Sequence, residues 1–342
     1  MSDFKQKEDT SWLDNLRVFA TISVIFLHVA APFVTKFGKI SISNWWWANT
    51  SDGLVRFCVP VFVMLTGALL LPRPHTLKAY LKNRLVRIVI PFAFWTAIYI
   101  CHAIYEKPSN YSLTFIVDKL INGAAYHLWY IYMIIGIYLI IPIISTWIRT
   151  ASEKEILYFL ALWVISILAT QPIISNYTPD FNLKYFSGFI GYLVLGHYLS
   201  RIKFENVKQI KLISFSIFFA GVLLTIIGTY LLSSQKGKFI VDLYTYFSLN
   251  VVIAAIGIFL FFKQFTLRNK HVLKFRNFIN RNSFGIYFVH ILVLFYLNKA
   301  GINGSILTPK FGIFITTGLC LFCSCVIIHF LKKIPFGHKL VG

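Results

Sequence analysis

Two polar residues in the first long apolar segment have the spacing of a reactive site. Arg17 and His28 are eleven residues apart within the apolar run 15–34. At about 100° per residue, a helix returns over that interval to within roughly 20° of the same face, about 16 Å further along its axis. Both side chains would therefore point into one groove. A guanidinium at its mouth suits an anionic coenzyme, and a deep imidazole suits proton transfer.

The same two residues also have a purely structural interpretation. Arg17 could pair with Asp14 one turn earlier, and His28 could bind a backbone carbonyl. The shared helix face favours a functional pair. Arg84 and Arg87 follow the same logic, because residues three apart are neighbours on a helix and two guanidinium forks suit phosphate groups. Taken alone, these two arginines fit positive-inside anchoring equally well.

A second group of polar and aromatic residues lies at the start of a later apolar run. His127, Trp129 and Tyr130 come from the sequence His-Leu-Trp-Tyr. An imidazole beside two aromatic rings resembles a sugar-stacking surface, and it equally resembles an interfacial aromatic belt. These three residues are therefore candidates for substrate binding, and the motif alone does not decide between the two interpretations.

A third group adds another deep imidazole. Ser283 and His290 are seven residues apart, which again places them close to one helix face, with Tyr287 between them. His290 could bond His28 through water or hold a substrate hydroxyl. In the second apolar run, Thr66-Gly67 would permit close packing against the first helix.

These residues need a membrane to position them. Of 342 residues, 57% are hydrophobic and only 13% charged, against roughly 25% charged in a soluble domain. The sequence predicts an all-α, polytopic transmembrane bundle that forms one domain over 1–342, with no appended soluble domain. About ten apolar runs are long enough to be considered as spans, the sixth being the shortest. They cover residues 15–34, 54–72, 86–105, 125–146, 155–174, 185–200, 210–232, 239–262, 283–299 and 311–331.

The charge balance orients the bundle. There are 33 Lys and Arg against 12 Asp and Glu, a formal net charge of +21. Because the basic residues occupy short gaps between apolar runs, a nucleic-acid partner is not expected. Most of them lie on one side if both termini are cytoplasmic, as the positive-inside rule requires. The five cysteines have no neighbouring His, Asp or Glu to complete a metal site, so no metal is expected.

Together these motifs resemble the acyltransferase family 3 proteins, bacterial membrane-bound O-acyltransferases, and in particular the stand-alone type that modifies surface glycans. The resemblance covers essentially the whole chain. It rests on Arg-x10-His at Arg17 and His28, Arg-x-x-Arg at Arg84 and Arg87, the His127 run and the Ser-x-Gly-x-Tyr-x-x-His pattern ending at His290. Thr66 stands where the family pattern has Ser.

The resemblance implies a fold and a reaction. The family fold is a bundle of about ten helices, in the bacterial inner membrane. The family uses acetyl-CoA or another acyl-CoA as the cytoplasmic donor and usually a carbohydrate hydroxyl, free or lipid-linked, as acceptor. Arg17, Arg84 and Arg87 would hold the coenzyme, and His28 would be general base or acyl relay, assisted by His290. His127, Trp129, Tyr130, Ser283 and Tyr287 would meet the acceptor. Membrane lipid and other glycan-assembly proteins are the expected partners.

One alternative belongs to another class of protein. A transporter or flippase for an anionic or lipid-linked substrate would also place arginines in a membrane cavity. Such proteins commonly contain paired interrupted segments in matching halves of the chain, and this sequence contains none that we can identify. The acyl group, the acceptor sugar, the side of final transfer and the oligomeric state are not encoded in any motif.

Overall fold

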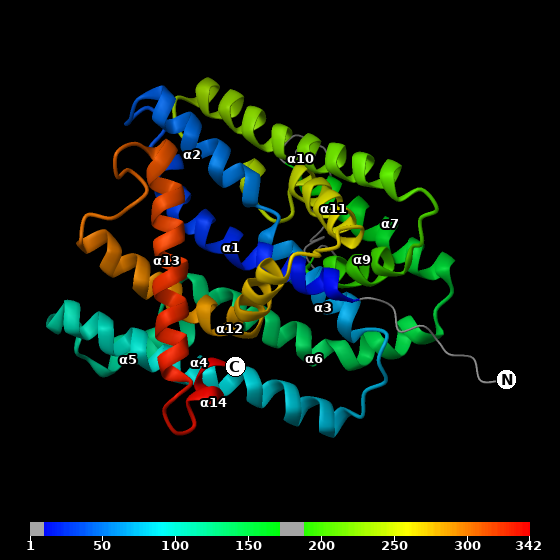
Figure 1. Ribbon diagram of the computed structural model, residues 1–342, viewed down its shortest axis with the longest axis horizontal. Coiled ribbons are helices and arrows are strands. Elements are labelled where there is room, and N and C mark those ends of the chain that lie inside the picture. Colours follow the sequence, from blue (N-terminus) through cyan, green and yellow to red (C-terminus); the bar gives the residue numbers. More distant parts are fainter. Residues whose placement is uncertain (1–9, 172–187) are drawn as a thin grey trace.

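The computed structural model describes residues 10–171 and 188–342, and within these ranges the chain folds into α-helices without β-strands (Figure 1). The α-helices of the first half are α1 (Ser11–Val34), α2 (Ile42–Val55), α3 (Cys58–Leu70), α4 (Leu77–Glu106), α5 (Leu113–Asn122), α6 (Trp129–Thr150) and α7 (Glu153–Ala169). Those of the second half are α9 (Ile190–Arg201), α10 (Val207–Lys236), α11 (Leu249–Lys263), α12 (Lys270–Lys299), α13 (Pro309–Leu331) and α14 (Gly337–Val341). Short 3₁₀ turns occupy Pro108–Asn110, Tyr126–Leu128 and Asp242–Tyr244.

Eight segments of the described chain are long and apolar enough to cross a bilayer, which confirms the predicted polytopic helical bundle. They contain α1, α2 with α3, α4, α6, α10, α11, α12 and α13. The two remaining predicted runs, 155–174 and 185–200, correspond to the shorter helices α7 and α9, and both runs extend into residues outside the described ranges.

Helix α1 occupies the centre of the bundle, with α2, α3, α11, α12 and α13 packed around it (Figure 1). Its sequence explains this position. Apolar or small residues continue around the whole helix, so Leu16, Ala20, Ile25 and Ala30 are all buried. A helix without a polar face is stable only when other helices or lipid surround it. Arg17 and His28 are therefore held by a helix that five other helices of the described chain contact.

Close helix contacts depend on small residues at one crossing in particular. A Cβ at Gly67 of α3 would lie 1.8 Å from the carbonyl oxygen of Leu193 in α9, and a Cβ at Gly196 would lie 2.1 Å from that of Met64. Glycine on both helices lets the two backbones touch. The predicted partner of Thr66-Gly67 was the first helix, and this was wrong, because Gly67 packs against α9.

The N-terminal half of α12 brings two distant parts of the chain to the same end of the bundle. Arg276 of α12 donates to the carbonyl oxygen of Ser11, at the start of α1, at 3.2 Å. Lys332, just after α13, donates to the carbonyl oxygen of Arg281 at 3.1 Å. The start of α1 and the end of α13 thus share one end of the molecule. That this end faces the cytoplasm stays a prediction.

Candidate active site

A cavity of about 530 Å³ lies inside the bundle, between helices that are far apart in the sequence. It is lined by α1, α3, α4, the start of α6 and α12. All ten residues singled out in the sequence line it: Arg17, His28, Arg84, Arg87, His127, Trp129, Tyr130, Ser283, Tyr287 and His290. Their placement in one cavity makes the cavity the candidate active site, and their individual roles stay predictions.

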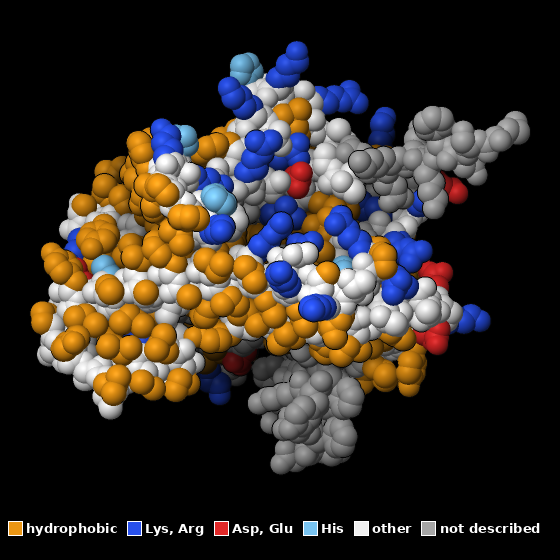
Figure 2. Space-filling view, turned by 90° about the horizontal axis from the view of Figure 1, so that it is seen from below, with side chains coloured by type: hydrophobic (Ala, Val, Ile, Leu, Met, Phe, Trp, Pro, Cys, Tyr) orange, Lys and Arg blue, Asp and Glu red, His pale blue; other side chains and the backbone are white. Residues whose placement is uncertain are grey.

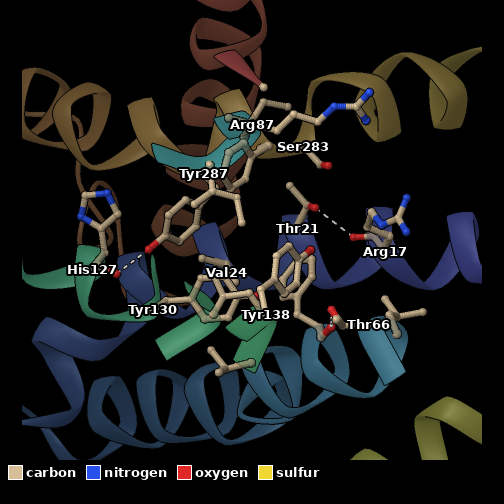
Figure 3. A pocket seen from close by; sticks show the side chains of 18 of the residues that line it. Arg17, Thr21, Val24, Thr66, Arg87, His127, Tyr130, Tyr138, Ser283 and Tyr287 are labelled. Atoms are coloured by element: carbon tan, nitrogen blue, oxygen red, sulfur yellow. Dashed lines mark hydrogen bonds between the residues drawn. The ribbon is translucent and has the colours of Figure 1, made fainter. Parts of the chain in front are cut away.

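Arginines gather at one end of the cavity. Arg17, Arg73, Arg84 and Arg87 all contribute to its lining. Figure 3 shows Arg17 and Arg87 on one side and His127 on the opposite side, with Tyr130 and Tyr287 between them. Four guanidinium groups with few nearby carboxylates make this end strongly attractive to a phosphate-bearing molecule.

Arg17 has partners from two helices. Its Nη1 donates to Asn280 Oδ1 of α12 at 3.1 Å and lies 3.5 Å from the Asp14 carboxylate. Arg17 therefore does pair with Asp14, as the structural interpretation of this residue predicted. Asp14, however, is shared with Arg276, which lies 3.3 Å away, so this carboxylate offsets only part of the positive charge. Within the described chain, no ion pair involves Arg73, Arg84 or Arg87.

Three histidines lie together at the other end of the cavity. The His290 ring is 5.3 Å from the His28 ring and 5.2 Å from the His127 ring, measured between centroids. His290 therefore lies between the other two. It is fully buried, His127 is nearly so, and His28 is half-buried against the cavity. Three separate helical segments, α1, the turn before α6, and α12, bring these rings together.

The main chain fixes the orientation of His290. Its Nδ1 lies 2.6 Å from the carbonyl oxygen of Tyr287. Because a carbonyl can only accept, Nδ1 must carry the proton in the neutral ring, which leaves Nε2 with a free lone pair. Nε2 has no hydrogen-bond partner among the described residues. An imidazole held by its Nδ1–H, with Nε2 left available, is arranged to accept a hydrogen bond from a neighbouring N–H or O–H group.

Aromatic rings line the middle part of the cavity, between the arginines and the histidines. The Tyr287 hydroxyl donates to the carbonyl oxygen of His127 at 2.5 Å, and its ring lies 5.5 Å from that of Tyr130 (Figure 3). Trp129 stacks on Tyr246, with centroids 5.7 Å apart and planes inclined by 27°. Broad flat rings beside an imidazole suit the apolar faces of a sugar.

Several site residues were missed from the sequence. Arg73 and Tyr246 line the cavity, and Asn280 holds Arg17. Arg73 had a visible signal, since it follows an apolar run close to the Arg84–Arg87 pair. Tyr246 and Asn280 had none, because the contacts that place them in the site, with Trp129 and Arg17, join segments more than a hundred residues apart.

A buried ion pair beside the site was also missed. Arg56 Nη2 lies 2.5 Å from Asp52 Oδ2, and the Asp52 side chain is fully buried. The Arg56 guanidinium covers the ring of Tyr244 at 4.2 Å, and the Tyr244 hydroxyl donates to Asn49 Oδ1 at 2.5 Å. The i, i+4 spacing of Asp52 and Arg56 was the available signal. This network joins α2 to the chain segment that carries Tyr246.

The described residues contain no group of three or more His, Cys, Asp or Glu side chains that could hold a metal ion. The chemistry available in the cavity follows from the groups at its two ends. The cationic end can bind an anion, and the imidazoles can accept and return a proton.

Fold and cavity together define a multi-pass membrane protein with an internal cavity as its candidate active site. The chain belongs to acyltransferase family 3, because the family model, described as an acyltransferase domain, matches residues 10–330. This confirms the resemblance inferred from the motifs and makes the protein a membrane acyltransferase. No curated protein and no solved structure matches the chain.

Proposed function

We propose that this protein transfers an acyl group, acetyl in the simplest case, from acyl-CoA to a hydroxyl group of a cell-surface polysaccharide or its lipid-linked precursor in the bacterial inner membrane. The observation that carries the proposal is the single cavity with arginines at one end and three imidazoles at the other. Acyl transfer from a coenzyme to a sugar needs both features, at the two ends of one long donor molecule.

The arginine end suits the nucleotide of coenzyme A. Its diphosphate and ribose phosphate carry several negative charges, and Arg73, Arg84 and Arg87 offer guanidinium forks that form no ion pair in the described part of the chain. The pantetheine arm would then extend past Thr66 and Val24, both of which line the cavity, and bring the thioester to the histidines. The helix rise puts His28 about 16 Å beyond Arg17 along α1, a span that the arm can bridge.

The imidazole end suits the transfer step. In the direct route, His28 takes the proton of the acceptor hydroxyl while the hydroxyl oxygen attacks the thioester carbonyl carbon. The carbon–sulfur bond breaks, and the imidazolium returns the proton to the departing thiolate, which leaves as free CoA thiol. In the relay route, an imidazole nitrogen attacks the thioester carbonyl carbon, the carbon–sulfur bond breaks, and the thiolate takes the other ring proton and leaves as free CoA thiol. The acceptor hydroxyl oxygen then attacks the acyl carbon, the carbon–nitrogen bond breaks, and the imidazole receives the hydroxyl proton. Either route requires a neutral ring with a free nitrogen lone pair.

His290 and the aromatic rings would position the reactants. The free Nε2 of His290 can accept a hydrogen bond from His28 or from the acceptor hydroxyl. His127, Trp129, Tyr130 and Tyr287 line the part of the cavity where an acceptor would bind, whereas Ser283, the fifth residue predicted to meet the acceptor, lies nearer Arg17 and Arg87 (Figure 3). Stacked rings would hold the sugar, and the Tyr287 hydroxyl would provide a polar contact.

Thiol release from acetyl-CoA by purified protein tests the proposal. The wild type, His28→Ala and His102→Ala would be compared in detergent, with and without extracted lipid-linked glycan. His102 is a matched control, because it lies in α4 and does not line the cavity. We expect release by the wild type and His102→Ala, increased by the glycan, and none by His28→Ala.

Two further results would separate binding from chemistry. His28→Ala should still bind CoA, whereas Arg84→Ala with Arg87→Ala should weaken CoA binding. Full activity in His28→Ala would remove the role proposed for this residue. Absence of thiol release from folded wild type, with any acyl-CoA or glycan, would overturn the proposal and favour transport of an anionic or lipid-linked substrate.

A further inference from the structure

A second hollow on the molecule is strongly basic and separate from the reaction cavity. This groove has a volume of about 700 Å³ and lies between the first half of α12 and the end of α13. Its lining contains no acidic side chain and consists of Lys270, Leu273, Lys274, Asn277, Phe278, Arg281, Asn282, His329 and Lys332. We call it the α12–α13 groove. None of these residues lines the reaction cavity.

Helix periodicity separates the two sites on α12. Lys270, Lys274 and Arg281 recur at intervals of four and seven residues, which places them on one face. A second face, roughly 140° away, carries Arg276, Asn280, Ser283, Tyr287 and His290. That second face contacts α1 and the reaction cavity. The basic stripe therefore serves something other than the acyl-transfer site.

The charges in the groove lack counter-ions within the described chain. No ion pair involves Lys270, Lys274 or Arg281, although Arg276 on the other face of α12 is paired with Asp14. Partial burial lowers the pKa of Lys332, and the positive charge of Arg281 lowers it further. Like charges held together without a carboxylate favour an anion from outside the chain.

Apolar side chains surround this basic groove. On α12, Leu273 and Phe278 line the groove and Phe278 is 40% exposed, and on α13 Phe330, next to the lining residue His329, is 59% exposed. Ile334 and Phe336, just after α13, are also exposed. In Figure 2, Lys and Arg side chains gather beside a broad hydrophobic surface. A soluble phosphate would make no use of the apolar rim, whereas a phospholipid places its phosphate in the groove and its chains on the apolar surface.

We propose that the α12–α13 groove binds the head group of an anionic phospholipid. Its phosphate would contact Lys274, Arg281 and Lys332, with Lys270 nearby at the rim. Its acyl chains would lie along the exposed apolar face of α13, which includes Phe322 and Phe330. This site does not depend on the acyl-transfer reaction, and lipid binding can be measured without turnover.

Native mass spectrometry of the detergent-purified chain tests this site. The wild type would be titrated with phosphatidylglycerol and, separately, with phosphatidylcholine of the same acyl chains. Lys274→Gln with Arg281→Gln removes two groove charges. Arg201→Gln with Lys208→Gln is the matched control, because it removes two exposed basic charges outside the groove. We expect tighter binding of phosphatidylglycerol to the wild type and control, and at least roughly tenfold weaker binding to the groove variant.

Several results would overturn the proposal. The wild type could bind both lipids equally, or the groove variant could bind phosphatidylglycerol as tightly as the wild type does. The control variant could lose as much affinity as the groove variant, or soluble glycerol phosphate could displace the lipid. Displacement would identify a site for free phosphate. If Lys274→Gln with Arg281→Gln does not elute as folded protein, Lys270→Gln with Lys274→Gln replaces it, because both lysines are exposed in the first turns of α12.

Discussion

At the scale of single residues, the most informative feature is the ring of His290. Its Nδ1–H is fixed by the Tyr287 carbonyl, so the direction of the Nε2 lone pair is set by the backbone of α12 itself. A hydrogen-bond acceptor whose orientation is fixed in this manner needs no neighbouring carboxylate, and no Asp or Glu is found among the residues lining the cavity. The backbone carbonyl performs the orienting role that a carboxylate has in many acid–base sites.

This geometry predicts the effect of changing His290. In His290→Asn, the side-chain amide can still donate to the Tyr287 carbonyl, but no group reaches the position of Nε2. We expect kcat for acyl transfer to fall by roughly 10²-fold, because His28 or the acceptor hydroxyl loses the hydrogen bond that positions it, with CoA affinity little changed. Steady-state kinetics and CoA binding would be measured on the same preparation. A kcat within a few-fold of the wild type would show that His290 only fills space.

The Asp52–Arg56 pair gives a second prediction at this scale, about stability. In Asp52→Ala, the buried Arg56 charge loses its partner, and we expect the free energy of unfolding to fall by about 3–5 kcal/mol. Unfolding in detergent would measure it. Asp52→Leu with Arg56→Met removes both charges and should recover much of the loss. If the single and double variants are equally unstable, the unpaired Arg56 charge is not the cause of the lost stability.

At the scale of helices, the crossing of α3 and α9 depends on direct backbone contact. Gly67→Ala would place a methyl group against the Leu193 carbonyl, and we expect a lower unfolding temperature and a free-energy loss of at least about 1–3 kcal/mol. Gly318→Ala is the control, since a Cβ at Gly318 would meet nothing within 4 Å. Equal behaviour of the two variants in thermal unfolding would show that α3 and α9 can separate without cost.

The helices also show what could be predicted from the sequence. Apolar runs were sufficient to find the long spans, because their length and composition are set by the bilayer. The common face of Arg17 and His28 was predictable because it depends on one helix alone. The contact between α3 and α9 could not be predicted, because within a bilayer the hydrophobic effect does not determine which helix packs against which. Asn280 and Tyr246 were missed for the same reason.

At the scale of the whole molecule, the end that carries the arginines is predicted to face the cytoplasm, where acyl-CoA would be available. In a Cys101→Ser background, Lys339→Cys and Ser305→Cys would be labelled in intact cells with a membrane-impermeant maleimide. Both positions are exposed, and they lie after α13 and between α12 and α13, hence at opposite ends. We expect labelling of Ser305→Cys, and labelling of Lys339→Cys only after lysis. The reverse pattern would place the arginines outside and exclude a cytoplasmic donor.

The two faces of α12 link the reaction cavity to the surrounding bilayer. One rigid helix carries the basic groove on one side and Ser283, Tyr287 and His290 on another. A helix turns as a unit, so any rotation that improves the contact of Lys274 with a phosphate also moves the His290 ring. If the groove binds an acidic phospholipid and the cavity transfers acyl groups, as proposed, then the lipid composition of the membrane would influence the acyl-transfer rate through the position of this one helix.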